Sequence, residues 1–326
     1  MANLKVIGTG SYLPEKIIDN SYFEDKLLKR YDVNGEVVGK KRITSDGIYG
    51  VTGIRERREA MENEWPSDLG YKAVVRALDD ASVSADSLVG IIVSTISEKS
   101  NFPSAACKIQ ERLGIKECVS YDIAAACAGF PLALGLANSS FNSNKGNYAV
   151  VGSECLRRIS DKTDINDTLF GDGAGAVILT PTEESIGFLG GYIRTSPLNG
   201  MLNWIFRDKN DYLKMPEGER VMKAAIRGML DTAHTIEERL GLGEVGCDVY
   251  IPHQANGRIL DRVASKVEKK GGKVYRNIEN FGNMSSATIP VALDFALKEG
   301  FIEEGNKVML TAVGAGLVAS AAAIQF

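Results

Sequence analysis

The chain has 326 residues, of which 44% are hydrophobic and 25% charged, the composition of a globular protein large enough for two packed halves. A formal net charge of −4 leaves no basic footprint for nucleic acid, and no apolar run approaches the roughly 20 residues of a membrane-spanning helix. The five cysteines are odd in number and form no Cys-x-x-Cys pair, which argues against a disulfide framework and a zinc site and favours a reducing cytoplasm.

The first half of the chain alternates helices and strands. Apolar periodicity predicts an amphipathic helix over 68–81, a buried strand over 89–95 and a helix over 103–113. Strands are predicted over 119–123 and 147–152. Short apolar strands between helices indicate an α/β protein with mixed, mostly parallel sheets covered by helices.

The second half repeats this order. We expect a helix over 219–240, a strand over 248–251, a helix over 255–267, and strands over 274–278 and 307–311. Two long units with matched order and spacing indicate an internal duplication. The chain should therefore divide into an N-terminal half and a C-terminal half, residues 1–180 and 181–326.

Cys127 follows the predicted strand 119–123 and precedes an apolar, helix-like stretch. A thiol at the N-terminal end of a helix feels the positive end of the helix dipole, which favours the thiolate. The small residues around it leave room for a substrate carbonyl. A buried, inert cysteine is the alternative.

The chain has two histidines. His234 lies inside a predicted helix, where no pattern singles it out. His253 follows a strand and a proline, at an element boundary where catalytic groups are commonly placed. Asn283 follows a glycine at a predicted strand-to-helix turn; it would suit a helix cap or, beside a histidine, an oxyanion site. Because Cys127 also follows a strand end, these three side chains can converge.

Beyond these residues, the chain resembles the thiolase-fold condensing enzymes, most closely β-ketoacyl-acyl-carrier-protein synthase III. The matching stretches lie in order along nearly the whole chain: residues 8–15, 52–57, 102–107, 122–130, 170–176, 252–256 and 282–283. Single motifs of this kind are weak, but their order is specific.

The resemblance implies a thiolase-like five-layer αβαβα fold made of two duplicated halves, and a homodimer. It implies a catalytic triad of Cys127, His253 and Asn283, with an oxyanion hole formed by the backbone amides of Cys127 and Ala315. It also implies that Phe102 lines the acyl pocket of the partner subunit.

The resemblance further implies that Arg258 and Lys223 dock an acyl carrier protein. No metal or other cofactor is expected, because acyl-carrier-protein or acyl-CoA thioesters are the substrates. The implied reaction is a decarboxylative condensation of a cysteine-linked acyl group with malonyl-acyl-carrier-protein, in fatty acid initiation or a related pathway. The alternative is a specialised condensing enzyme or acyltransferase of secondary metabolism.

The sequence departs from the family pattern in two places that concern the acyl donor. Ile48 and Ile165 stand where the family commonly has the Trp and Arg that sandwich the adenine of coenzyme A, and neither can stack. Residues 25–42 are an additional charged segment, interpreted as a tolerated surface insertion, a lid or a carrier-protein contact. We therefore expect a donor other than simple acetyl-CoA.

Overall fold

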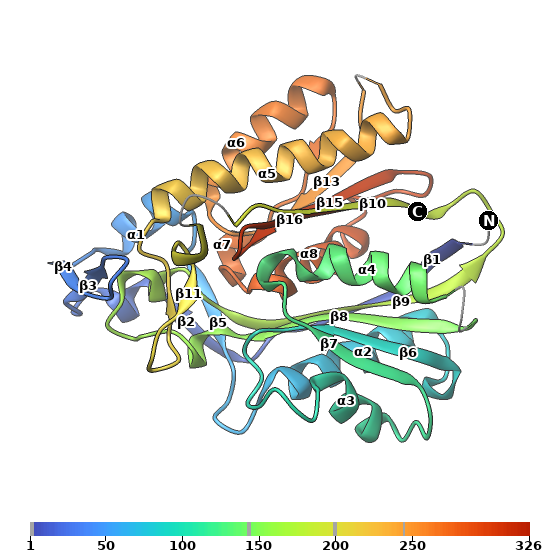
Figure 1. The fold of residues 1–326 in the computed structure, drawn as a ribbon, viewed down its shortest axis with the longest axis horizontal. Coiled ribbons are helices and arrows are strands. Elements are labelled where there is room, and N and C mark those ends of the chain that lie inside the picture. Colours follow the sequence, from blue (N-terminus) through green and yellow to red (C-terminus); the bar gives the residue numbers. More distant parts are fainter. Residues whose placement is uncertain (1–2, 142–144, 198–200, 244) are drawn as a thin grey trace.

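The computed structural model describes residues 3–141, 145–197, 201–243 and 245–326. Two five-stranded sheets alternate with three layers of helices (Figure 1). The outer layers are formed by α2 (Pro66–Ala81) with α3 (Ala105–Leu113), and by α5 (Gly218–Arg239) with α6 (Gly257–Val267). The middle layer contains α4 (Gly129–Ser140) and α8 (Thr288–Lys298). The expected five-layer αβαβα arrangement is confirmed.

The first sheet has the strand order β1-β9-β8-β6-β7. Its strands are β1 (Asn3–Tyr12), β6 (Leu88–Ser94), β7 (Val119–Ile123), β8 (Asn147–Cys155) and β9 (Asp172–Thr182). The second sheet has the corresponding order β10-β16-β15-β13-β14. Its strands are β10 (Gly187–Thr195), β13 (Val249–Pro252), β14 (Lys273–Val274), β15 (Lys307–Gly314) and β16 (Val318–Gln325). The two sheets thus repeat one topology, as a duplication requires.

Two details of the predicted sheets are wrong. Each sheet is evenly mixed, with two parallel and two antiparallel pairings, because a hairpin-like strand pair flanks each parallel core. The strand expected over 274–278 pairs only at Lys273–Val274, and the chain then turns into α7 (Ile278–Phe281). The short strand brings the following turn directly to the edge of the sheet.

The helix α4 is apolar on all sides because it lies between the two sheets. Phe130, Ala133 and Leu134 are fully or almost fully buried in the cluster that joins both sheets. Each large side chain buried there contributes about 1.5–3 kcal/mol. Pro131 lies in the first turn of the helix, where its missing N–H leaves no intrahelical bond unmade.

Smaller elements gather at one end of the molecule (Figure 1). They are β2 (Lys16–Asp19), β3 (Leu28–Tyr31), β4 (Val37–Lys41), α1 (Ser45–Thr52), β5 (Glu56–Glu59), β11 (Phe206–Arg207) and β12 (Leu213–Lys214). No helix within the described ranges has the length and apolar character to cross a membrane.

Candidate active site

Cys127 lies in a tight turn between a sheet and a buried helix. The chain leaves β7 at Ile123, forms a 3-10 turn over Ala126–Ala128 and continues directly into α4. Ala126 has a φ of +47°, a left-handed conformation that costs a non-glycine residue about 1–2 kcal/mol. The turn thus places the thiol at the first turn of α4, as the sequence predicts.

Close backbone approach fixes this turn from both sides. A Cβ on Gly129 would lie 1.8 Å from the Ser94 hydroxyl oxygen at the end of β6. A Cβ on Gly314, at the end of β15, would lie 2.7 Å from the Ala125 carbonyl oxygen and 3.0 Å from the Cys127 amide nitrogen. The missing side chains therefore let strands of both sheets contact the cysteine turn.

His253 follows β13 and is 2% exposed. Its backbone N–H donates to the Thr311 carbonyl (2.8 Å), and its Nδ1 lies 2.7 Å from the Thr288 hydroxyl. The Thr288 hydroxyl donates to the Ser285 carbonyl at 3.0 Å, so its single proton is used there. Nδ1 is then the protonated nitrogen, and Nε2 carries the free lone pair.

Asn283 is held by its backbone and by one atom of its side chain. Its N–H donates to the Leu169 carbonyl (2.8 Å), and its carbonyl accepts from Gly171 (3.0 Å). The side-chain oxygen accepts from the Ser285 N–H at 2.8 Å, while Nδ2 has only a 3.5 Å contact with the Ala255 carbonyl. The side-chain oxygen therefore caps the following turn, as in a helix cap, and the NH₂ group remains able to donate a hydrogen bond to a ligand.

Cys127, Asn283 and Ala315 line one cavity of about 260 Å³. The other walls are mainly apolar and come from several loops: Ile96, Leu156, Phe170, Ile205, Phe206, Leu213 and Met215. His253 is not among the lining residues; through Thr288 it is tied to the turn that carries Ser285, another lining residue. In the described part of the chain, no group of three or more His, Cys, Asp or Glu residues is placed to hold a metal.

Desolvation favours the uncharged form of both Cys127 and His253. Desolvation raises the pKa of Cys127 to about 12, only partly opposed by the Ser285 hydroxyl, and the Glu154 carboxyl adds to the rise. Burial also lowers the pKa of His253 to about 3. This desolvation acts against the thiolate expected from the helix dipole, and that expectation stays a prediction.

Glu154, at the end of β8, is a fully buried carboxyl that the sequence analysis missed. One of its oxygens accepts from the Ile96 N–H (3.1 Å) and from the hydroxyls of Thr95 and Ser97. The other lies 3.1 Å from the Ser286 hydroxyl. Burial raises the pKa of Glu154 to about 7. A charged residue directly after a buried strand was the available signal.

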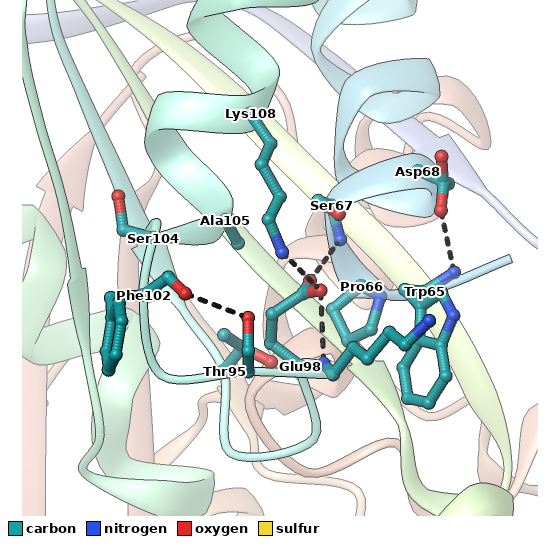
Figure 2. A network of polar contacts seen from close by, with 12 residues as sticks. Trp65, Pro66, Ser67, Asp68, Thr95, Glu98, Phe102, Ser104, Ala105 and Lys108 are labelled. Atoms are coloured by element: carbon teal, nitrogen blue, oxygen red, sulfur yellow. Dashed lines mark hydrogen bonds and ion pairs between the residues drawn. The ribbon is translucent and has the colours of Figure 1, made fainter.

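The remaining predicted residues lie apart from this cavity. Phe102 lies on the loop after β6 and is 83% exposed. Glu98 fixes the base of this loop by accepting hydrogen bonds from the Ser67 N–H (2.8 Å) and from Lys108 Nζ (3.0 Å). The ring of Phe102 points away from these contacts (Figure 2). Arg258 donates to the Gly50 carbonyl.

The two basic residues are also separate from each other. Arg258 lines a shallow pocket between α1 and α6, with Tyr49 and Asp261. Lys223 lines a groove of about 690 Å³ between α5 and the second sheet, and pairs with Glu219 at 2.8 Å. The structure thus does not bring Arg258 and Lys223 into one pocket.

The two isoleucines at the expected nucleotide position form an apolar surface that is closed over Phe23 and Leu28, and Ile165 also lines a cavity with Arg30 and Tyr31. Ile48 is 2% exposed and packs with Phe23 and Leu28, and Ile165 covers the same cluster. At the two positions where the family commonly has a Trp and an Arg, this chain therefore has apolar side chains that pack into the same cluster.

Comparison with known proteins agrees with this architecture. A family model described as 3-oxoacyl-[acyl-carrier-protein] synthase III matches residues 121–197, and its C-terminal counterpart matches residues 238–326. A β-ketoacyl-[acyl-carrier-protein] synthase III of Pectobacterium atrosepticum is 39% identical over 99% of both chains. The chain belongs to the β-ketoacyl-acyl-carrier-protein synthase III family. It is an acyl-transferring condensing enzyme.

Solved structures of the family share the fold over almost the whole chain. The 3-oxoacyl-[acyl-carrier-protein] synthase III of Aquifex aeolicus has a TM-score of 0.89 and 34% identity, covering 99% of this chain and 100% of that one. The priming β-ketosynthase of the R1128 polyketide pathway has a TM-score of 0.86 and 28% identity, covering 99% and 96%. This β-ketoacyl synthase III fold therefore also serves a polyketide pathway in a relative.

Proposed function

We propose that this synthase condenses a Cys127-bound acyl group with malonyl-acyl-carrier-protein, with loss of CO₂, in fatty acid initiation. The observation that carries the proposal is the cavity lined by Cys127, Asn283 and Ala315, to which His253 is tied through Thr288 and the lining residue Ser285. A covalent intermediate lets one site serve two successive thioesters. The names of the curated relatives support the same reaction.

In the first half-reaction, the sulfur of Cys127 attacks the carbonyl of an acyl thioester. Because the thiol is neutral, its proton leaves as the C–S bond forms; Nε2 of His253 accepts it and passes it to the departing thiol. The negative oxygen is held by the amides of Cys127 and Ala315, a type of contact worth about 3–4 kcal/mol. Nε2 can accept the proton because Nδ1 carries the imidazole proton and leaves the Nε2 lone pair free.

In the second half-reaction, the malonyl thioester occupies the same site. The NH₂ of Asn283 donates to its thioester carbonyl, and so does Nε2 of His253 once the Thr288 hydroxyl has turned and the imidazole proton has moved to Nε2. These bonds stabilise the enolate that forms when the C–CO₂ bond breaks. The enolate carbon then attacks the acyl-enzyme carbonyl, the C–S bond breaks so that Cys127 leaves as the thiolate, and one proton from solvent restores the thiol.

The acyl group occupies the apolar part of the cavity. A volume of about 260 Å³ is at the small end of ligand sites, which commonly measure about 300–1,000 Å³. We infer a short or branched acyl group. The closed surface at Ile48 and Ile165 supports a donor that is not recognised by its adenine, in contrast to acetyl-CoA priming.

We further propose a homodimer in the cytoplasm. The strand β7 is an edge strand, and Val119 on it is 39% exposed. Such an edge pairs readily with a second copy of itself. The exposed ring of Phe102 lies on the neighbouring loop, in position to enter a partner's acyl pocket.

Acylation mass spectrometry tests the proposed function. Incubation with a panel of acyl-CoA and acyl-carrier-protein donors should add one acyl mass to the wild type and none to Cys127→Ala. Addition of malonyl-acyl-carrier-protein should then release CO₂ and a β-ketoacyl product. Covalent acylation of Cys127→Ala would refute the nucleophile, and efficient acetyl-CoA priming would refute the donor assignment.

A further inference from the structure

The additional segment 25–42 forms a charged hairpin at the mouth of the substrate cavity. It contains β3 and β4, which project beyond the sheets at one end of the molecule (Figure 1). Arg30 and Tyr31 of this charged hairpin line an outer cavity of about 330 Å³, together with Ile165, Asn166 and Met215. Met215 also lines the inner cavity that contains Cys127. The outer cavity, which we call the vestibule, is therefore the neighbour of the inner cavity across the side chain of Met215.

The base of the charged hairpin is fixed to the vestibule wall. The Lys29 N–H donates to the Thr163 carbonyl at 2.7 Å, and the Tyr31 hydroxyl donates to Asp161 at 3.0 Å. The ammonium of Lys214 lies 3.7 Å from the centre of the Tyr31 ring. Leu28 is buried in the core below. These contacts hold Arg30 at the vestibule without a conformational change.

The exposed part of the charged hairpin carries positive charge without partners. Six basic residues face three carboxylates over 25–42, a net charge of +3 in a chain of net charge −4. Within the described ranges, none of its basic side chains forms an ion pair; they are Lys26, Lys29, Arg30, Lys40, Lys41 and Arg42. Four apolar side chains beside them are 40–61% exposed: Leu27, Val33, Val37 and Val38. Apolar and cationic groups together are typical of a protein-docking surface with an acidic partner.

The carboxylates of the vestibule already have cationic partners. Glu217 pairs with Arg220 at 3.2 Å, and Glu219 pairs with Lys223 at 2.8 Å. Arg30 is thus the cation at this vestibule that a ligand anion can use.

We propose that the charged hairpin docks an acidic carrier domain and that Arg30 binds the phosphate of its thioester arm, so that carrier-bound donors reach Cys127 in preference to nucleotide-bound ones. This inference rests on the proposed function and adds a recognition element to it. The positive charge of the hairpin favours an acidic protein partner, and the vestibule of about 330 Å³ beside Met215 has room for the arm of a carrier but not for the carrier itself. Ile48 and Ile165 themselves offer neither an aromatic ring nor a cation to a base.

The test compares donors that differ only in what carries the acyl group. The rate of Cys127 acylation is measured by intact mass spectrometry with acyl-carrier-protein, acyl-phosphopantetheine and acyl-N-acetylcysteamine. In Lys40→Glu/Lys41→Glu, the second-order rate should fall about tenfold or more with the carrier protein and stay within about twofold with both small thioesters. Arg30→Gln should slow both phosphate-bearing donors by about fivefold and leave acyl-N-acetylcysteamine unchanged.

The matched control is Lys5→Glu/Lys145→Glu, the same charge change at the opposite end of the first sheet. It should leave all three rates within about twofold, and thermal melting should confirm that every variant is folded. If the variants lost acylation rate equally with all three donors, the charged hairpin would have only a structural role. If their acylation rate with the carrier protein were unchanged, the proposal would be overturned. So would binding of the charged hairpin to anionic phosphatidylglycerol vesicles with unchanged carrier rates. Failure of the proposed function is distinct: the wild type would then accept an acyl group from none of the three donors.

Discussion

The two halves of the molecule contain the same backbone turn, but the turn has a different role in each half. In the first half, a 3-10 turn over Ala126–Ala128 leads into α4; in the second, a 3-10 turn over Ser285–Ala287 leads into α8. Ala126 has a φ of +47° and Ser285 a φ of +45°, so both turns begin on the same strained conformation. By this correspondence, the counterpart of Cys127 is Ser286.

The side chains that follow the two strained residues have different fates. Cys127 faces the cavity. The Ser286 hydroxyl is buried, donates to the Ser94 carbonyl at 2.7 Å and lies 3.1 Å from Glu154. The duplicated backbone therefore places one side chain at each of two equivalent turns. The side chain is a cavity-facing thiol in the first turn and a buried, hydrogen-bonded hydroxyl in the second.

The largest effect should come from the first turn. Cys127→Ala removes the acyl acceptor, so we expect overall condensation to fall by at least about 10³-fold, with malonyl decarboxylation retained. Product formation and CO₂ release are measured separately. Cys107→Ala, an exposed cysteine elsewhere, is the control and should keep full activity.

The second turn should affect the other half-reaction. Asn283→Ala removes a donor to the enolate oxygen, which should slow decarboxylation and condensation by about 10²–10³-fold. Acylation of Cys127, measured by mass spectrometry, should change by less than about threefold. Equal losses in both half-reactions would contradict this division of labour between the turns.

Glu154 contacts the second turn through Ser286, and its ionisation should appear in stability. Its pKa of about 7 lies above the ordinary 4.5, so the folded protein holds a proton that the unfolded chain releases. The free energy of unfolding should therefore fall between about pH 4.5 and 7, by about 3 kcal/mol from this group.

The substitution Glu154→Gln should remove this dependence, which urea titrations across that pH range would measure against the wild type. Because the Ser286 proton is engaged at Ser94, the Gln NH₂ can donate to Ser286 as a protonated Glu154 would. Glu184→Gln, at an exposed ion pair, should leave the pH dependence as it is. If the free energy of unfolding of Glu154→Gln changed with pH as steeply as that of the wild type, Glu154 would be ionised in the folded protein over this whole pH range.

The smallest expected effect concerns how tightly the first turn is packed. Gly129→Ala would place a methyl group 1.8 Å from the Ser94 hydroxyl, and we expect a loss of about 1–3 kcal/mol. Gly135→Ala, in the same helix α4, meets its nearest atom at 3.9 Å and should be neutral or stabilising by up to about 1 kcal/mol. Thermal melts of the two variants measure the difference, and equal melting points would argue against a constrained turn.

Much of the architecture is predictable from sequence because it depends on local periodicity. A strand end predicted the turn that carries Cys127, and the repeat of order predicted two matching sheets; Asn283 instead follows the short helix α7. The length of β14 was mispredicted because its residues pair with only one neighbour, at the sheet edge. Whether the division at residue 180 separates two domains stays a prediction; the chain passes from β9 to β10 between Thr182 and Gly187.

The details of the site depend on contacts between distant segments, which periodicity does not encode. Thr288 orients His253 from 35 positions away, and Glu154 contacts a serine 132 positions away. The desolvation that raises the pKa of Cys127 is likewise a property of packing. The placement of the charged hairpin beside the vestibule also required the structure, since its sequence left a surface insertion, a lid and a carrier-protein contact as alternatives.

Reciprocal contacts between the halves have a consequence for fragment complementation. Ser286 of the second half holds the Ser94 carbonyl of the first, and Ser320 of the second holds the Ala128 carbonyl in the cysteine turn at 2.7 Å. Asp294 likewise accepts from Thr9 and Ser11. Cutting the chain near residue 180 would expose all these groups to water. We therefore expect that neither half forms the site alone and that activity requires both fragments together.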